Sequence, residues 1–254
     1  GDSFTFGDQV ADDQTWPAYL EEVIGCRVAN GGVFGYGFDQ IVLRAEELTT
    51  ILKPDVLIVS LIEDDVNRCE LSLRTGWPKP YFEPVGEGLV LRNVPTPRPP
   101  GERELFRRLG GYSLLVHLMM TRINPEYWLY GLEDAVNRAT RVHDQGFEVA
   151  CRLMSRLAEL KERRNLKAIV LFQYPKDLER GLFRDLAGCV AQNKLELVDL
   201  YQPLKKIRLE NHQEYEAMFT KGHMRPPGNR FVAEVLAQVL IPVLSEVRSP
   251  EEAN

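Results

Sequence analysis

Apolar residues along the chain follow two different patterns. From Phe38 to Leu52 they recur at the spacing of an amphipathic helix, and from Val56 to Ile62 they form one continuous run. A continuous apolar run of this length is typical of a strand covered on both faces, as in a parallel sheet. The pattern predicts a helix followed by a buried strand.

Helical and strand-like apolar patterns also alternate in the first 30 residues and again in the second half of the chain. This alternation predicts these further elements: a helix from Thr15 to about residue 24, a strand over 26–30, a helix over 132–164, a strand over 168–172, a helix over 175–191, a strand over 195–200 and a helix over 231–247. Strands that alternate with helices indicate an α/β fold with a parallel sheet. A chain of 254 residues is long enough for one such domain with a sizeable core.

The alternation is interrupted between about residues 69 and 130. Prolines crowd the stretch from Pro78 to Pro100, which is also rich in glycine. We expect a long excursion with a hairpin at Gly88–Arg92 and a helical patch over Tyr112–Thr121. Long ordered loops inside compact domains are often functional lids. The sequence therefore predicts one domain over residues 1–254, with a Pro/Gly-rich insertion that could cover a site.

Charge and cysteine content exclude several classes of function. The chain has 31 basic and 37 acidic residues, a net charge of −6, with neither a basic stripe for nucleic acid nor a polybasic run for a membrane surface. No stretch approaches the ~18 apolar residues of a membrane span. The four cysteines lack metal-ligand spacing and are expected to be thiols rather than a disulfide framework. We expect no bound metal, no cofactor and no nucleic-acid partner. The sequence does not indicate membrane association, and it leaves the oligomeric state open.

The first candidate for chemistry stands at the start of the chain, in Gly1-Asp2-Ser3-Phe4-Thr5-Phe6-Gly7. A serine between an acidic and an aromatic residue, on a turn flanked by glycines, suits a hydroxyl presented where a strand ends and a helix begins. Ser3 is thus a candidate nucleophile, or else it only caps the helical segment that follows. A strand should precede such a turn, so we expect an upstream strand that this sequence lacks, and the compartment stays open.

Two later segments offer groups for a ligand. The stretch Asn30-Gly31-Gly32-Val33-Phe34-Gly35 follows the expected strand over 26–30, and its glycines allow close backbone approach with N–H groups as donors. The acidic turn Glu63-Asp64-Asp65 follows the buried strand, at the sheet edge where α/β sites lie. Each has a simpler interpretation, as an ordinary turn and as a solvated acidic loop. Metal binding by the acidic turn finds no further ligands in the sequence.

A histidine in the loop before the closing helix, His223, completes a set of four blocks. They are Gly1-Asp2-Ser3, Asn30 to Gly35, the acidic turn, and His223 with Gly228 after it. In order and spacing they resemble the blocks of the SGNH hydrolases, also called GDSL esterases and lipases, over nearly the whole chain. The resemblance implies a flavodoxin-like three-layer α/β/α sandwich with a parallel sheet, here without its first strand.

The resemblance also implies roles for single residues. Ser3 would be the nucleophile, and its own N–H would be one donor of the oxyanion hole. Gly35 would give a second N–H, and His223 would be the general base. Asp2, Asn30 and Asp65 would support these groups.

Two positions depart from the family pattern. Asp64 falls where the family has an asparagine whose side chain is the third oxyanion donor, and Asp65 matches the aspartate that follows it. An ionised Asp64 could only accept hydrogen bonds and would repel the oxyanion. The family's triad aspartate, two or three residues before the histidine, falls on Lys221 or Thr220, and neither can orient His223. Carboxylates elsewhere could substitute: Asp199 or Glu216.

The function implied is hydrolysis of an ester by Ser–His catalysis, acting on an O-acyl group such as acetyl on a carbohydrate or lipid. The two replaced positions keep alternatives open. The chain could be a weakened or inactive member that binds an acylated or glycan ligand without turnover, or it could be an acyltransferase.

Overall fold

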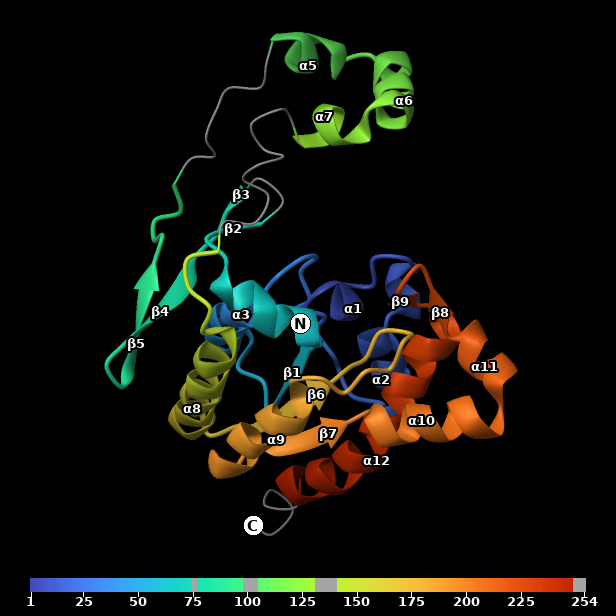
Figure 1. Cartoon of the computed structure of the whole chain (residues 1–254). Coiled ribbons are helices and arrows are strands. Elements are labelled where there is room, and N and C mark those ends of the chain that lie inside the picture. The colour runs from blue at the N-terminus through green and yellow to red at the C-terminus, as the bar shows by residue number, and fades with distance from the viewer. Residues whose placement is uncertain (75–76, 98–104, 131–140, 249–254) are drawn as a thin grey trace.

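The computed structural model describes residues 1–74, 77–97, 105–130 and 141–248. Its centre is a parallel sheet of β1 (Val56–Leu61), β6 (Lys167–Phe172) and β7 (Glu196–Asp199), hydrogen-bonded in the order β1-β6-β7 (Figure 1). In register, Val56 lies opposite Lys167, and Ile169 lies opposite Glu196. The parallel sheet expected from the continuous apolar runs is confirmed.

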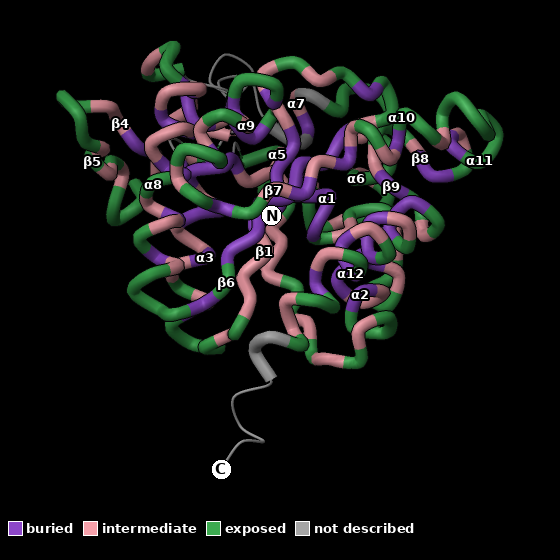
Figure 2. Tube along the Cα trace, turned by 90° about the horizontal axis from the view of Figure 1, so that it is seen from below, coloured by how far each residue is buried: buried purple, intermediate pink, exposed green. Residues whose placement is uncertain are grey.

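Helices cover both faces of this sheet. Seen from below in Figure 2, α3 (Phe38–Leu52) and α8 (Gly146–Arg164) lie on one side of β1 and β6, and α2 (Trp16–Ile24) and α12 (Pro226–Arg248) lie on the other. Helix α9 (Phe183–Gln192) packs beside α8. This is the three-layer α/β/α sandwich that the resemblance implies. Strand β6 is buried from Ala168 to Phe172 and forms the middle of the core.

The remaining elements surround the sandwich or belong to the insertion. They are α1 (Ser3–Phe6), α4 (Glu63–Asn67), β2 (Leu73–Arg74), β3 (Trp77–Pro78), β4 (Tyr81–Val85), β5 (Gly88–Arg92), α5 (Leu105–Gly110), α6 (Leu114–Ile123), α7 (Pro125–Tyr130), α10 (Tyr201–Glu210), α11 (His212–Ala217), β8 (Phe219–Thr220) and β9 (His223–Met224), with short 3₁₀ turns at Asp12–Gln14 and Arg68–Glu70.

One edge of the sheet faces a cavity. The side of β1 away from β6 has no strand partner among the described residues, and Val56 to Val59 line a cavity of about 600 Å³. Residues 26–29 and Gly31 also line it. The strand predicted over 26–30 is wrong: among the described residues, no backbone group of residues 27–30 forms a hydrogen bond to another backbone group, as a strand requires.

Two helices begin later than their apolar spacing predicted. Helix α8 begins at Gly146, whose N–H donates to Glu70 Oε1 at 3.1 Å; residues 131–140 of the predicted helix lie outside the described residues. Helix α9 begins at Phe183 rather than near residue 175. Positive φ angles at Leu178 (57°) and Gly181 (38°) exclude a continuous helix before it. Apolar spacing alone does not reveal such interruptions.

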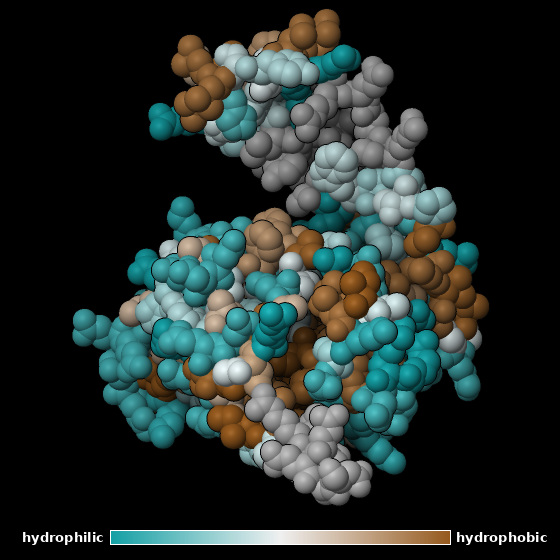
Figure 3. Space-filling view, turned by 180° about the vertical axis from the view of Figure 1, so that it is seen from behind, coloured by the Kyte–Doolittle hydropathy of each residue, from teal (hydrophilic) through white to brown (hydrophobic). Residues whose placement is uncertain are grey.

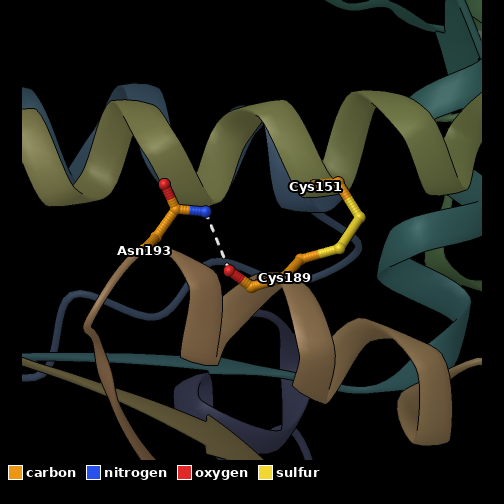
Figure 4. The surroundings of a disulfide bond; sticks show 3 residues. All are labelled: Cys151, Cys189 and Asn193. Atoms are coloured by element: carbon orange, nitrogen blue, oxygen red, sulfur yellow. Dashed lines mark hydrogen bonds between the residues drawn. A yellow bond between two sulfur atoms is a disulfide. The ribbon is translucent and has the colours of Figure 1, made fainter.

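The expectation that all four cysteines are thiols is wrong. Cys151 on α8 and Cys189 on α9 form a disulfide, with their Cα atoms 5.2 Å apart (Figure 4). The two residues are 38 positions apart in sequence, and only the side-by-side packing of the two helices brings them together. Cys26 and Cys69 are not part of a disulfide.

The segment between α4 and α8 contains two distinct parts. The antiparallel hairpin of β4 and β5 packs on α8 and buries Phe82; the hairpin was predicted at Gly88–Arg92, which forms only its second strand, β5. Helices α5, α6 and α7 stand clear of the α/β body in Figure 1. The helical patch predicted over Tyr112–Thr121 corresponds to α6. Within the described ranges, no helix is both long enough and apolar enough to cross a membrane.

Candidate active site

Ser3 is the first residue of α1, a single helical turn. Asp2 precedes it as the N-cap, and its Oδ1 accepts a hydrogen bond from the N–H of Phe4 at 3.0 Å. Gly7 ends the turn in the left-handed region, at φ 89°. Because Asp2 is the cap, the alternative interpretation of Ser3 as the helix cap is wrong. The side chain of Ser3 does not cap the helix, and the residue is 5% exposed.

His223 reaches Ser3 from the other end of the chain. Strands β8 and β9 form a small hairpin in which Thr220 pairs with His223. The two residues between them, Lys221 (φ 46°) and Gly222 (φ 88°), both have the positive φ that a two-residue type I′ turn requires. The hairpin brings His223 Nε2 to 2.9 Å from Ser3 Oγ. The imidazole also packs on the Phe4 ring, with 5.2 Å between centroids.

The Ser3 hydroxyl has two acceptors within reach. Besides His223 Nε2 at 2.9 Å, Asp2 Oδ2 lies 3.2 Å away. One hydroxyl proton can be given to only one of them at a time. With the proton directed to the imidazole, the arrangement is that of a nucleophile and its general base, within the reach of about 2.6–3.2 Å that proton transfer needs.

The other ring nitrogen of His223 has no partner. Nδ1 is buried, and no hydrogen-bond acceptor or donor for it exists among the residues that the structure describes. The two carboxylates that could have substituted are engaged elsewhere. Asp199 accepts hydrogen bonds from Tyr174 and Arg180, and Glu216 pairs with Lys176. The expectation that a distant carboxylate orients His223 thus finds no support in the contacts of either residue.

A largely buried arginine, Arg68, connects three segments around Ser3. Its Nη1 donates to Asp65 Oδ1 at 2.7 Å and to the carbonyl of Tyr36 at 3.0 Å, and lies 3.7 Å from Asp2 Oδ2. Its side chain is 11% exposed. One guanidinium therefore ties the serine turn, the glycine-rich loop and the acidic turn together. Arg68 lies outside the four sequence blocks, so the sequence pattern did not point to it.

Asp65 is the anchor of this cluster. Its Oδ2 accepts from the N–H of Ile62 at 3.0 Å and fixes the start of α4, and the side chain is fully buried. Burial raises the pKa of Asp65 well above its usual value, the negative charge of Asp2 adds to the rise, and the Arg68 guanidinium opposes it. Asp65 is thus a structural carboxylate that depends on Arg68.

The glycine-rich loop lies directly against the serine turn. Asn30 Nδ2 donates to the carbonyl of Thr5 at 2.9 Å, and its Oδ1 accepts from the N–H of Gly32. A Cβ on Gly32 would lie 2.4 Å from the backbone nitrogen of Phe6, so only glycine fits there. Gly35 has φ 75°, also a glycine conformation. Asn30 and Gly32 therefore fix the loop against α1 and so set where Gly35 lies.

Asp64 differs from the other candidates, because its side chain is 70% exposed. Its nearest charged partner is Arg68 Nη2, at 3.7 Å. Sequence reasoning required burial to keep this carboxyl neutral and able to donate. The exposure of Asp64 removes that condition.

The backbone amides expected for an oxyanion hole are available. Neither the Ser3 N–H nor the Gly35 N–H has a protein acceptor within the described part of the chain. In that same part, no group of three or more histidine, cysteine or carboxylate side chains is arranged to hold a metal ion. The pair of Ser3 and His223 thus offers a hydroxyl beside an imidazole.

Comparison with solved structures gives the fold of this arrangement. One similar structure is assigned to the G-D-S-L lipolytic family and comes from Desulfitobacterium hafniense DCB-2; it is 13% identical, has a TM-score of 0.50, and the match covers 94% of this chain and 95% of the other. A second structure is 16% identical, with a TM-score of 0.51 and coverage of 96% and 94%. A third, the acetyl xylan esterase AlAXEase, is 12% identical, with a TM-score of 0.47 and coverage of 94% and 96%.

No protein-family model matches the sequence, and no curated protein matches it. At these identities the likeness is one of fold. The chain has the α/β/α fold of the G-D-S-L lipolytic proteins over nearly its whole length.

Proposed function

We propose that the chain is a serine hydrolase of the SGNH type that cleaves a carboxylic ester. The observation that carries the proposal is the 2.9 Å contact between Ser3 Oγ and His223 Nε2, which joins residues 220 positions apart in sequence. The fold shared with a G-D-S-L lipolytic protein supports it. The substrate class we favour is an O-acyl group, such as acetyl, on a carbohydrate or lipid.

The proposed mechanism uses groups of this chain alone. Ser3 Oγ attacks the ester carbonyl while His223 Nε2 takes its proton, and the same proton is then given to the departing alkoxide. The N–H groups of Ser3 and Gly35 stabilise the negative oxygen of the tetrahedral intermediate. A water molecule, activated by His223, then releases the acyl group from Ser3.

Nδ1 of His223 has no hydrogen-bond partner among the described residues, and this favours a second candidate function. If Nε2 accepts the serine proton, Nδ1 must carry a hydrogen, and a buried N–H without an acceptor costs about 1–3 kcal/mol. That cost weakens His223 as a base. A protein that binds an acylated or glycan ligand without turning it over is the alternative that this observation supports.

Hydrolysis of p-nitrophenyl acetate and p-nitrophenyl butyrate separates the two candidates. We expect turnover by the wild type, and loss of it in Ser3→Ala and in His223→Ala. The matched controls are Ser155→Ala and His212→Ala, which change exposed residues of the same types. Turnover that survives Ser3→Ala, or no turnover by the wild type, would contradict the hydrolase proposal.

A further inference from the structure

Helices α5, α6 and α7 expose an unusually apolar surface. Large side chains that are more than half exposed follow one another through α5 and α6: Leu105, Phe106, Leu109, Tyr112, Leu114, Leu115, Leu118, Met119 and Ile123. In Figure 3 brown side chains gather on the outer part of this unit. Scattered exposed apolar residues are ordinary on a protein surface, but a continuous group of this kind marks an interaction site.

The outward direction of this surface is fixed by the packing inside the unit. Trp128 on α7 is 6% exposed, and its Nε1 donates to Nδ1 of His117 on α6 at 2.9 Å. A Cβ on Gly110 would lie 2.9 Å from the Trp128 ring, so α5 also approaches it closely. The same Cβ would lie 3.0 Å from Val116, which is partly buried, so the face of α6 that carries Val116 is the inner one. Leu114, Leu118 and their neighbours cannot turn inward without breaking this small core.

The charge of the unit is opposite to that of the whole chain. Across α5, α6 and α7 the charged residues are Arg107, Arg108, Arg122 and Glu126, a net charge of +2, whereas the full chain has a net charge of −6. Arg108 and Arg122 are exposed, and Arg122 lies on α6 among the apolar residues. Short helices with aromatic and aliphatic side chains on one face and arginines beside them are typical of segments that lie in the interface of an anionic membrane.

We propose that the outer face of α5 and α6 docks on the surface of an anionic phospholipid bilayer. The apolar side chains would enter the boundary between headgroups and acyl chains, and Arg108 and Arg122 would contact lipid phosphates. A second copy of the chain is a poorer occupant, because a two-fold interface between these faces would place Arg108 and Arg122 against α5 and α6 of the copy, and neither helix carries an acidic residue. In this proposal the helices lie on the membrane surface and do not cross it, so the proposal is compatible with a sequence that has no membrane-spanning run.

Vesicle flotation with the full chain tests the proposal without any need for catalysis. We expect the wild type to float with vesicles of phosphatidylcholine plus phosphatidylglycerol and much less with phosphatidylcholine alone. The variant Leu115→Asp/Ile123→Asp should bind at least about tenfold more weakly, because two apolar groups are replaced by charges. Its matched control is Leu209→Asp/Ile241→Asp, which makes the same substitutions and the same charge change at exposed positions on α10 and α12, and should bind like the wild type. Thermal melting checks that both variants are folded.

A second pair of variants tests the arginines. Arg108→Gln/Arg122→Gln should weaken binding to anionic vesicles by roughly fivefold for each arginine, with the difference shrinking in high salt. Equal losses in the α6 variant and its α10/α12 control would overturn the proposal, as would equal binding to neutral and anionic vesicles. A dimer in solution that Leu115→Asp/Ile123→Asp dissociates, without vesicle binding by the wild type, would assign the face to a second copy instead. Failure of ester hydrolysis leaves these readouts unaffected.

Discussion

Ser3 Oγ and His223 Nε2 lie 2.9 Å apart, while the other nitrogen of the same imidazole, Nδ1, is buried and has no partner among the described residues. The pair thus has the contact that a nucleophile and its base require, and lacks the group that would orient the base. Lys221, two residues before His223, lies in the hairpin turn at φ 46°.

A carboxylate in this turn should strengthen the base. We expect Lys221→Asp to raise kcat/KM for a simple ester by about tenfold or more, as a part of the ~10⁴ that loss of a triad aspartate has cost elsewhere. Aspartate also tolerates the positive φ of this position better than lysine does. Lys221→Gln, which removes the positive charge without adding a carboxylate, is the control and should change kcat/KM little. Thr220→Asp tests the other position, and failure of both aspartates would show that His223 needs no such partner.

Asp64 should limit turnover in a way that a single substitution repairs. An exposed carboxylate near the site can only accept hydrogen bonds, whereas Asp64→Asn offers a neutral donor; one oxyanion donor is worth roughly 10²–10³ in rate. We expect kcat to rise. Glu63→Gln removes the adjacent charge and should not reproduce the gain. If Asp64→Asn lowers the rate, the carboxylate has another task, such as recognition of a substrate cation or hydroxyl group.

Arg68 should contribute more to stability than an exposed arginine does. Arg68→Gln leaves Asp2 and Asp65 buried without their cation, and breaking such a pair typically costs about 3–5 kcal/mol. Chemical denaturation measures the loss. Arg108→Gln, at an exposed site, should leave the free energy of unfolding within about 0.5 kcal/mol of the wild type.

The pH dependence of that loss follows from Asp65. Its folded pKa is raised above the usual 3.8, so the folded state holds a proton that the unfolded state has released. The contribution of Asp65 to the free energy of unfolding is therefore fully present below pH 3.8, and it is lost as the pH rises through the folded pKa. Without Arg68 the pKa rises further, and the penalty of Arg68→Gln should be larger at neutral than at acidic pH. A penalty that grows toward acidic pH would contradict this account of the cluster.

Elements defined by local pattern could be predicted, and those defined by distant partners could not. The helix at Phe38–Leu52 and the strand at Val56–Leu61 follow from apolar spacing and are confirmed. The segment 26–30 has the composition of a strand, but a strand also needs a neighbouring backbone, and this one faces a cavity. The composition of a segment does not reveal whether a second strand lies beside it.

The candidate site shows the same division. Motif order pointed to Ser3 and His223, because their neighbours form recognisable blocks. It did not point to Arg68, whose importance comes from contacts to Asp2, Tyr36 and Asp65 that only folding creates. The exposure of Asp64 could not be predicted either, since the burial of a side chain depends on what packs around it in the fold.

The disulfide between α8 and α9 should stabilise the sandwich. For residues 38 apart, the loss of chain entropy in the unfolded state corresponds to roughly 3–4 kcal/mol. We expect Cys151→Ser/Cys189→Ser to lower the free energy of unfolding by about that amount, and a reducing agent to lower the melting temperature of the wild type but not of this variant. Cys26→Ser leaves the disulfide intact and is the control. An unchanged melting temperature under reduction would contradict a stabilising role.

Labelling by a fluorophosphonate tests the central claim most directly, because only an activated serine reacts. We predict one adduct per chain, located on Ser3 by peptide mass spectrometry, strong reduction of labelling in His223→Ala, and none in Ser3→Ala. Ser155→Ala should be labelled like the wild type. Labelling of the wild type no stronger than that of Ser3→Ala would contradict the claim that the Ser3–His223 pair forms a catalytic centre.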